Sequence, residues 1–183
     1  KSDKIELTNG HTKQLTKDEL FICYNNQITR KKIKFDSFNI FTQNDLFNGL
    51  SDNEKIKAYG YLEIPKFKEC KRVKKFPVMF LVHHSGGNII STYKHRLQQR
   101  CIATFEPYIF LSRGIFRNYF DNEADIKWIT ETQGALDVLK AIDVLADDNQ
   151  IDSSKIGIMG WSYGGIVAIE AQNMFNIDLI KPK

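Results

Sequence analysis

Short apolar runs alternate with segments of helical periodicity between residues 77 and 175. The run over 77–82 is continuously apolar and of strand length, which is typical of a strand buried on both faces of a parallel sheet. Two further apolar runs, over 102–109 and 155–160, each follow a segment of helical pattern. This alternation predicts right-handed βαβ crossovers and a parallel sheet with helices on both faces.

Two runs of alternating apolar residues, over 33–40 and 56–64, precede this region and predict an antiparallel edge. The expected fold is therefore an α/β three-layer sandwich with a mostly parallel sheet and an antiparallel N-terminal edge. A length of 183 residues is typical of one domain, so we expect residues 1–183 to form a single α/β domain. Residues 1–30 are polar, lack a sustained period and stay unassigned.

Composition limits the classes of partner. The net charge is +4, and much of the basic excess lies over 66–75, which we interpret as a solvated hairpin loop. Such a run can also attract nucleic acid, an anionic membrane or an acidic substrate. Because stacking aromatic residues are not regularly interleaved with these cations, we expect no nucleic-acid partner.

No run reaches the about 18 apolar residues of a membrane span, so we expect a soluble chain. The thiols of Cys23, Cys70 and Cys101 are widely spaced and have no histidine at metal-ligand spacing, so neither a zinc site nor a disulfide framework is expected. The first residue is Lys1 rather than Met, which leaves the compartment open between the cytoplasm and export with removal of a signal peptide.

A Gly-x-Ser-x-Gly motif, Gly160-Trp161-Ser162-Tyr163-Gly164, connects the apolar run over 155–160 to an apolar helical segment. A serine at a sharp strand-to-helix turn adopts a strained backbone that raises its hydroxyl above the sheet, and flanking glycines leave room for the turn. We expect Gly165 to let the helix pack closely on the sheet. These features favour Ser162 as a nucleophile over a structural serine in a glycine-rich turn.

A second small-residue turn, His83-His84-Ser85-Gly86-Gly87, follows the run over 77–82. Small residues at this place allow backbone N–H groups to face a substrate oxygen. We therefore expect the amides of Ser85 and Tyr163 to form an oxyanion hole.

With these motifs, residues 56–175 resemble the dienelactone hydrolase and prolyl-oligopeptidase-like branch of the α/β-hydrolases. The stretch over 151–165 is especially similar to serine peptidase members, and Arg113-Gly114 resembles esterase-like members. The resemblance implies an acyl-Ser162 intermediate, an ester, lactone or peptide substrate, and no metal or organic cofactor. His84 stands where this branch usually has a glycine, and a residue with a Cβ resists positive φ, so an altered loop is expected.

A serine hydroxyl needs a base that removes its proton. In this fold an acidic residue and then a histidine follow the serine, whereas no histidine follows Ser162 in this sequence. Of the histidines present, His11 and His95 are expected at the surface, a structural role is expected for His83, and His84 remains a weak surrogate. We therefore expect the catalytic His and Asp beyond the present C-terminus, in a parent hydrolase of which this chain is a fragment.

Other readings stay open. The missing base also fits a non-catalytic, hydrolase-like binding or interaction module. A nucleotide-binding sheet is disfavoured because neither G-x-G-x-x-G nor G-x-x-x-x-G-K-[ST] occurs. Without a neighbouring strand, the run over 156–159 is expected to pair with another chain, for example in a dimer, or to aggregate.

Overall fold

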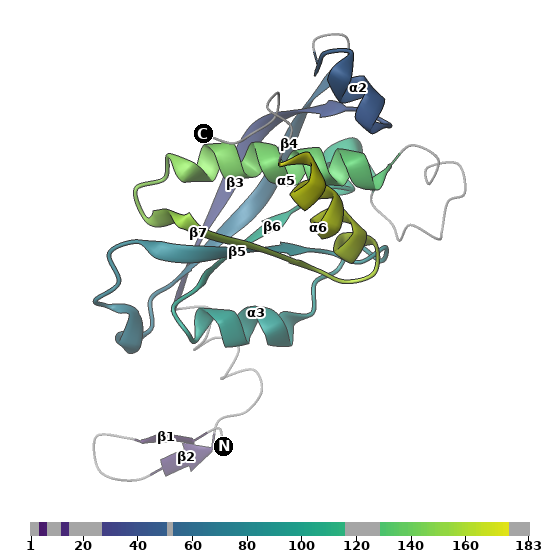
Figure 1. The fold of residues 1–183 in the computed structure, drawn as a ribbon. Helices are drawn as coiled ribbons and strands as arrows, with labels where there is room; N and C mark the ends of the chain where they lie inside the picture. The colour runs from purple at the N-terminus through teal and green to yellow at the C-terminus, as the bar shows by residue number, and fades with distance from the viewer. Residues whose placement is uncertain (1–3, 7–11, 15–26, 51–52, 116–128, 176–183) are drawn as a thin grey trace.

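The structure, a computed structural model, describes residues 4–6, 12–14, 27–50, 53–115 and 129–175 (Figure 1). Its strands are β1 (Lys4–Glu6), β2 (Thr12–Gln14), β3 (Ile28–Asn39), β4 (Glu54–Pro65), β5 (Phe76–Val82), β6 (Ala103–Pro107) and β7 (Ile151–Gly160). Its helices are α2 (Gln43–Phe47), α3 (Ser91–Gln98), α5 (Glu131–Ala146) and α6 (Tyr163–Met174), with short 3₁₀ turns η2 (Lys68–Cys70) and η3 (Leu111–Arg113).

Five strands form one mixed sheet in the order β3-β4-β6-β5-β7, and β1 and β2 form a separate pair. β4 runs antiparallel to both of its neighbours, whereas β5 runs parallel to β6 and β7. The predicted α/β fold with an antiparallel N-terminal edge is confirmed. The β1–β2 pair was missed because strands of three residues leave almost no period to read.

Helices cover the two faces of the sheet, as Figure 1 shows: α3 lies on one side, and α5 and α6 lie on the other. Between the layers, the largest fully buried side chains include Phe80, Phe105 and Leu136. β5 and β6 supply most of the strand residues in this core because both of their faces are covered.

The spacing of Ala135, Leu139, Ile142 and Ala146 predicts a helix with an apolar stripe on one face. The helix α5 forms there and buries Ala135, Leu139 and Ile142, whereas Ala146 is half-buried. The helix starts with a capping box, in which Gln133 N donates to the Thr130 hydroxyl and Thr130 N donates to the Gln133 side-chain oxygen. Both bonds satisfy amides that have no carbonyl partner within the helix, and so they fix where α5 begins.

Two expectations for the basic segment are wrong. The segment does not close a hairpin, because β6 lies between β4 and β5 in the sheet. Its 3₁₀ turn carries Cys70, which forms a disulfide with Cys101, although no disulfide framework was expected. The pairing was hidden by a sequence separation of 31, which the β5–α3–β6 unit folds back to a Cα–Cα distance of 5.4 Å.

Cys101 also ends α3 in an uncommon way. Its φ is +57°, a left-handed conformation usually taken by glycine. Cys101 N donates to Gln98 O and Ile102 N donates to Leu97 O, which together make a Schellman motif.

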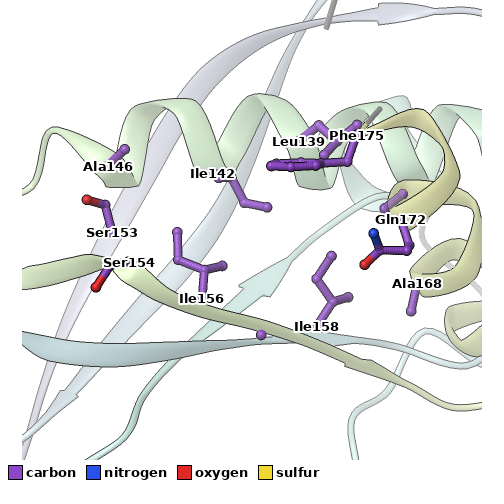
Figure 2. A pocket seen from close by; sticks show the side chains of 12 residues that line it. Leu139, Ile142, Ala146, Ser153, Ser154, Ile156, Ile158, Ala168, Gln172 and Phe175 are labelled. Carbon is purple, nitrogen blue, oxygen red and sulfur yellow. The ribbon is translucent and has the colours of Figure 1, made fainter. Parts of the chain in front are cut away.

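β7 forms one margin of the sheet among the described residues and pairs there with β5. Beside it, β7, α5 and α6 line a cavity of about 410 Å³ that includes Ile156, Ile158 and Phe175 (Figure 2). Within the described ranges, no helix is long and apolar enough to cross a membrane. His11 and Cys23 lie outside these ranges.

Candidate active site

Ser162 occupies a sharp turn between β7 and α6. It is the N-cap residue of α6 and has φ 51° and ψ −121°, outside the regions that L-residues favour. The residue is exposed, whereas Tyr163 and Gly164 immediately after it are buried. The turn therefore presents the Ser162 side chain to solvent from a strained backbone, in the form that the motif predicts.

Gly160 and Gly164 leave space for backbone rather than supplying positive φ. A Cβ on Gly160 would lie 2.0 Å from the Gly164 carbonyl oxygen, and a Cβ on Gly164 would lie 2.4 Å from the Val82 carbonyl oxygen. Gly165 differs, because the nearest atom to an added Cβ is 3.6 Å away. The expectation that Gly165 provides the close contact with the sheet is wrong, since Gly164 is the residue facing β5.

The small-residue turn after β5 lies beside the Ser162 turn. β5 and β7 are parallel neighbours with Val82 opposite Gly160, so the two turns leave the same end of the sheet. Gly87 N donates to His84 O over 2.8 Å and closes the turn, and Gly87 has φ +77°. His84 does not have a positive φ, so the expected conflict with its Cβ does not arise.

His83 and His84 hold this turn with their rings. His83 Nδ1 lies 2.9 Å from the His84 carbonyl oxygen, which can only accept, so we assign the proton to His83 Nδ1. Gly86 N donates to His84 Nδ1 over 2.9 Å. Burial lowers the pKa of His83, and the neutral ring packs between Phe110 and Tyr163 at centroid distances of 4.4 and 6.0 Å. The structural role predicted for His83 agrees with these contacts.

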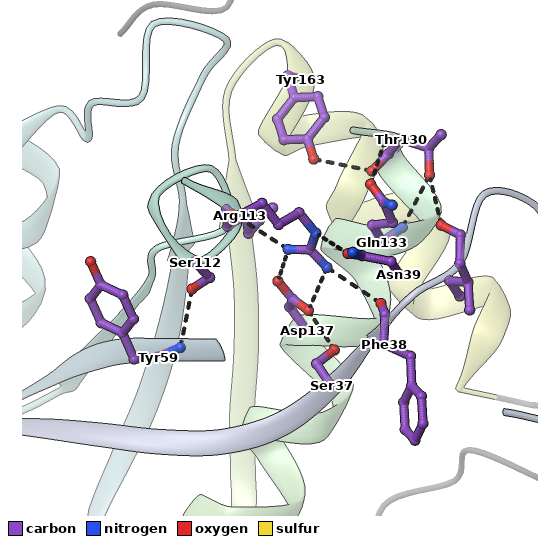
Figure 3. Close-up of polar contacts among 12 residues, drawn as sticks. Ser37, Phe38, Asn39, Tyr59, Ser112, Arg113, Thr130, Gln133, Asp137 and Tyr163 are labelled. Atoms are coloured by element: carbon purple, nitrogen blue, oxygen red, sulfur yellow. Dashed lines mark hydrogen bonds and ion pairs between the residues drawn. The ribbon is translucent and has the colours of Figure 1, made fainter. Parts of the chain in front are cut away.

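Tyr163 is anchored to the start of α5. Its hydroxyl donates to the Thr130 carbonyl oxygen over 3.2 Å (Figure 3). The hydroxyl also lies 2.9 Å from where a Cβ of Gly134 would stand, which explains the glycine in this helix. The residue after Ser162 is thus positioned by α5, a contact between residues 33 apart that motif reading did not find.

Arg113 ties α5 to the sheet. Arg113 Nη1 lies 2.6 Å from Asp137 Oδ2, and Arg113 Nη2 donates to Asp137 Oδ1 over 3.1 Å (Figure 3). Both side chains are buried, with 5% and 1% exposure. Arg113 Nε also donates to Asn39 Oδ1, and Ser37 donates to Asp137, so β3 joins the network. Sequence similarity pointed to Arg113, but nothing in the sequence identified Asp137 as its partner.

Within the described residues, no hydrogen bond joins a histidine ring to the Ser162 hydroxyl. His95, predicted at the surface, is half-buried on α3, and burial lowers its pKa. A polar cavity of about 100 Å³, lined by His83, Gly87, Glu106 and Tyr108 among others, lies at this end of β5 and β6. The described part of the chain contains no group of three or more His, Cys, Asp or Glu side chains that could hold a metal.

Comparisons with known proteins agree with this geometry. A family model described as the prolyl oligopeptidase family matches residues 121–177. Venom dipeptidyl peptidase 4 of Apis mellifera is 26% identical over 142 residues, which cover 67% of this chain and 18% of that protein.

Solved structures share the fold. Acylaminoacyl peptidase of Pyrococcus horikoshii aligns with a TM-score of 0.56 at 21% identity, over 94% of this chain and 25% of that one. The dienelactone hydrolase-like promiscuous phosphotriesterase P91 from metagenomic libraries aligns with a TM-score of 0.54 at 14% identity, over 82% of this chain and 56% of that one. The chain therefore spans less than two thirds of the length of the relatives it matches.

The sheet order and its covering helices give this chain the α/β-hydrolase fold of these solved structures. Within that fold, the matching family model is that of the prolyl oligopeptidase family, and the similar solved structures include dienelactone hydrolase-like proteins and an acylaminoacyl peptidase. Its relatives are hydrolases, both peptidases and esterases.

Proposed function

We propose that this chain carries the nucleophile of a serine hydrolase that cleaves an ester, lactone or peptide bond. The Ser162 oxygen attacks the carbonyl carbon of the substrate, and the leaving group departs with a proton as acyl-Ser162 forms. Water then attacks the acyl carbon and releases the carboxylic acid and free Ser162. The observation that carries this proposal is the strained, exposed conformation of Ser162 at the start of α6.

The amides of Tyr163 and Ser85 are proposed to receive the oxyanion. Tyr163 is the first residue of α6, and the amides of a first helical turn point out of its N-terminus together with the positive end of the helix dipole. Ser85 lies in the neighbouring turn after β5, directly before Gly86 and Gly87 in the sequence. Removing one such donor typically slows the reaction about 10²–10³-fold.

The base that takes the proton from Ser162 is proposed to lie outside this sequence. His83 is buried with its Nδ1 bonded to His84 O, and the Nδ1 of His84 is occupied by Gly86 N. Relatives of this chain extend well beyond the aligned region, and in this fold the Asp or Glu and then the His follow the serine. A His and an Asp supplied from there complete the triad.

The test uses the 183-residue chain and a version extended along its natural reading frame. A fluorophosphonate probe should label Ser162 in the extended protein, and the Ser162→Ala variant should lose the label. The 183-residue chain should label far more slowly, because no base is in place. Lack of labelling in a folded, extended protein that contains a downstream His would contradict the proposal.

A non-catalytic binding module is the second candidate. It is favoured by one observation, that no described histidine is hydrogen-bonded to Ser162. A stop codon directly after codon 183 in the natural gene would favour this module, whereas a frame that continues to an Asp and then a His would favour the enzyme.

A further inference from the structure

The segment over 66–75 carries more positive charge than the whole chain. Six cations and one acid, Glu69, give it a formal charge of +5, compared with +4 for the full sequence. All of these cations are exposed: Lys66, Lys68, Lys71, Arg72, Lys74 and Lys75. The remainder of the chain is close to neutral, so the positive potential is concentrated at this one place.

The disulfide brings two more cations to the segment. Cys70 and Cys101 hold the 3₁₀ turn against the end of α3, where Arg100 precedes Cys101 and Arg96 lies one helical turn earlier. Both arginines are exposed, and Arg100 Nη1 donates to Arg96 O over 3.0 Å. We call these eight cations the basic patch. Within the described residues, no ion pair involves any of them.

Of the three acids in and just after the α5–β7 turn, Asp148 and Asp152 pair with other cations, and Asp147 is exposed. Phe76 N donates to Gln150 O, which places the α5–β7 turn beside the segment. In this turn Asp148 already pairs with Lys31. Asp152, just after it, pairs with Lys155, which helps to lower the Asp152 pKa to about 2.

The basic patch is a surface and not a groove. None of its residues lines either cavity described above, and Phe67 within the segment packs against the core. The exposed large hydrophobic residues of the described chain all lie elsewhere. A single strand of nucleic acid is usually held in a channel with aromatic stacking, so this surface fits a broad anionic plane better.

Lysines and arginines gathered on an exposed surface can bind anionic lipid headgroups without a groove or stacking aromatic residues. We infer that the basic patch docks the protein on an anionic lipid surface through lysines and arginines alone, without insertion of apolar side chains. This inference is independent of the proposed hydrolase activity.

Docking in this way leaves the candidate active site accessible. The basic patch lies where β5 and β6 begin, whereas Ser162 follows the far end of β7 (Figure 1). Because the two lie at opposite ends of the parallel strands, a protein bound through the patch directs the Ser162 turn away from the lipid.

Co-sedimentation of the 183-residue chain with vesicles tests the inference. Vesicles of phosphatidylcholine with about one third phosphatidylglycerol should bind the chain at low salt and release it at high salt, while pure phosphatidylcholine should not bind it. Each cation near an anionic surface strengthens binding about fivefold. The Lys71→Gln, Arg72→Gln double variant should therefore bind about 25-fold more weakly.

The matched control removes two exposed lysines elsewhere, through Lys34→Gln and Lys55→Gln on β3 and β4. It should bind almost as well as the wild type. The inference is overturned if both double variants lose affinity equally, if the wild type does not sediment with the anionic vesicles, or if short duplex DNA binds more tightly than the vesicles at the same salt concentration.

Discussion

Two adjacent glycines after Ser162 differ in whether the surrounding structure leaves room for a Cβ atom. Gly164 faces the Val82 and His83 carbonyls at distances that exclude a Cβ, whereas Gly165 has room for one. The sequence motif predicts the first and last glycines of the turn, but it does not show which glycine touches the sheet. Which glycine contacts the sheet depends on how α6 packs against β5, and this packing is visible only in the folded structure.

Alanine substitution should separate these glycines. Gly164→Ala should destabilise the chain by about 1–3 kcal/mol or more, because backbone atoms must move to admit the methyl group. Gly165→Ala should leave stability unchanged or raise it by up to about 1 kcal/mol, because alanine is the better helix former. Urea unfolding followed by circular dichroism measures both. Equal destabilisation by the two substitutions would contradict the packing.

A buried neutral histidine makes stability depend on pH. The pKa of His83 is lowered in the folded state, below the ordinary value of about 6.5 that it has when unfolded. Its contribution is present above about pH 6.5 and is lost as pH falls through the folded pKa, because the unfolded chain then binds the proton more readily. Histidine titrates in this pH range, whereas most other side chains do not change their charge there.

The unfolding midpoint in urea should fall between pH 7 and pH 5, and His83→Gln should flatten this decline. His95 also has a lowered pKa, so His95→Gln is the control and should flatten the decline less, because His95 is only half-buried. A His83→Gln profile parallel to that of the wild type would show that His83 is not the group responsible.

Among the elements, strands and helices of the central region are largely predictable from periodicity, and their contacts are not. The apolar run over 77–82 and the stripe of α5 gave the correct elements. Asp137 and Cys70 find their partners across 24 and 31 residues, distances at which no local pattern carries information. The same holds for the candidate site. The local motif predicted Ser162, but it did not predict the hydrogen bond from Tyr163 to Thr130.

Substitutions of Cys101, at the end of α3, can separate the stabilising effect of the disulfide from the cost of the positive φ. Cysteine in the left-handed region costs about 1–2 kcal/mol relative to glycine, and the disulfide accounts for its presence. Cys101→Ala should lose about 3 kcal/mol of stability under oxidising conditions. Cys101→Gly should lose about 1 kcal/mol less, because glycine relieves the positive φ.

Cys70→Ala is the matched control, since it removes the disulfide and keeps Cys101 in place. Chemical unfolding with and without a reductant measures all three variants. In reductant, the Cys101→Gly variant should be more stable than the wild type. Should it be less stable than Cys101→Ala instead, the left-handed strain at position 101 would be refuted.

For the molecule as a whole, β7 forms one edge of the described sheet, and a partly apolar cavity lies beside it. Ile156 and Ile158 of β7 line this cavity. A strand edge of this kind offers unpaired backbone groups to another strand. We expect the 183-residue chain to self-associate through β7.

Sedimentation velocity should show association that increases with protein concentration. Ile158→Lys should reduce it by placing a charge beside the edge, whereas Ile169→Lys, on the exposed face of α6, should not. Far-UV circular dichroism checks that both variants fold. A chain that stays monomeric at high concentration would contradict this expectation.

The central claim is that Ser162 is a nucleophile facing converging amides, and a crystal structure of the extended protein after phosphonylation tests it most directly. The phosphorus should be bonded to Ser162 Oγ, with its oxygen about 2.7–3.1 Å from the amide nitrogens of Tyr163 and Ser85. Phosphorus on a different residue, or an oxygen directed away from both amides, would contradict the claim.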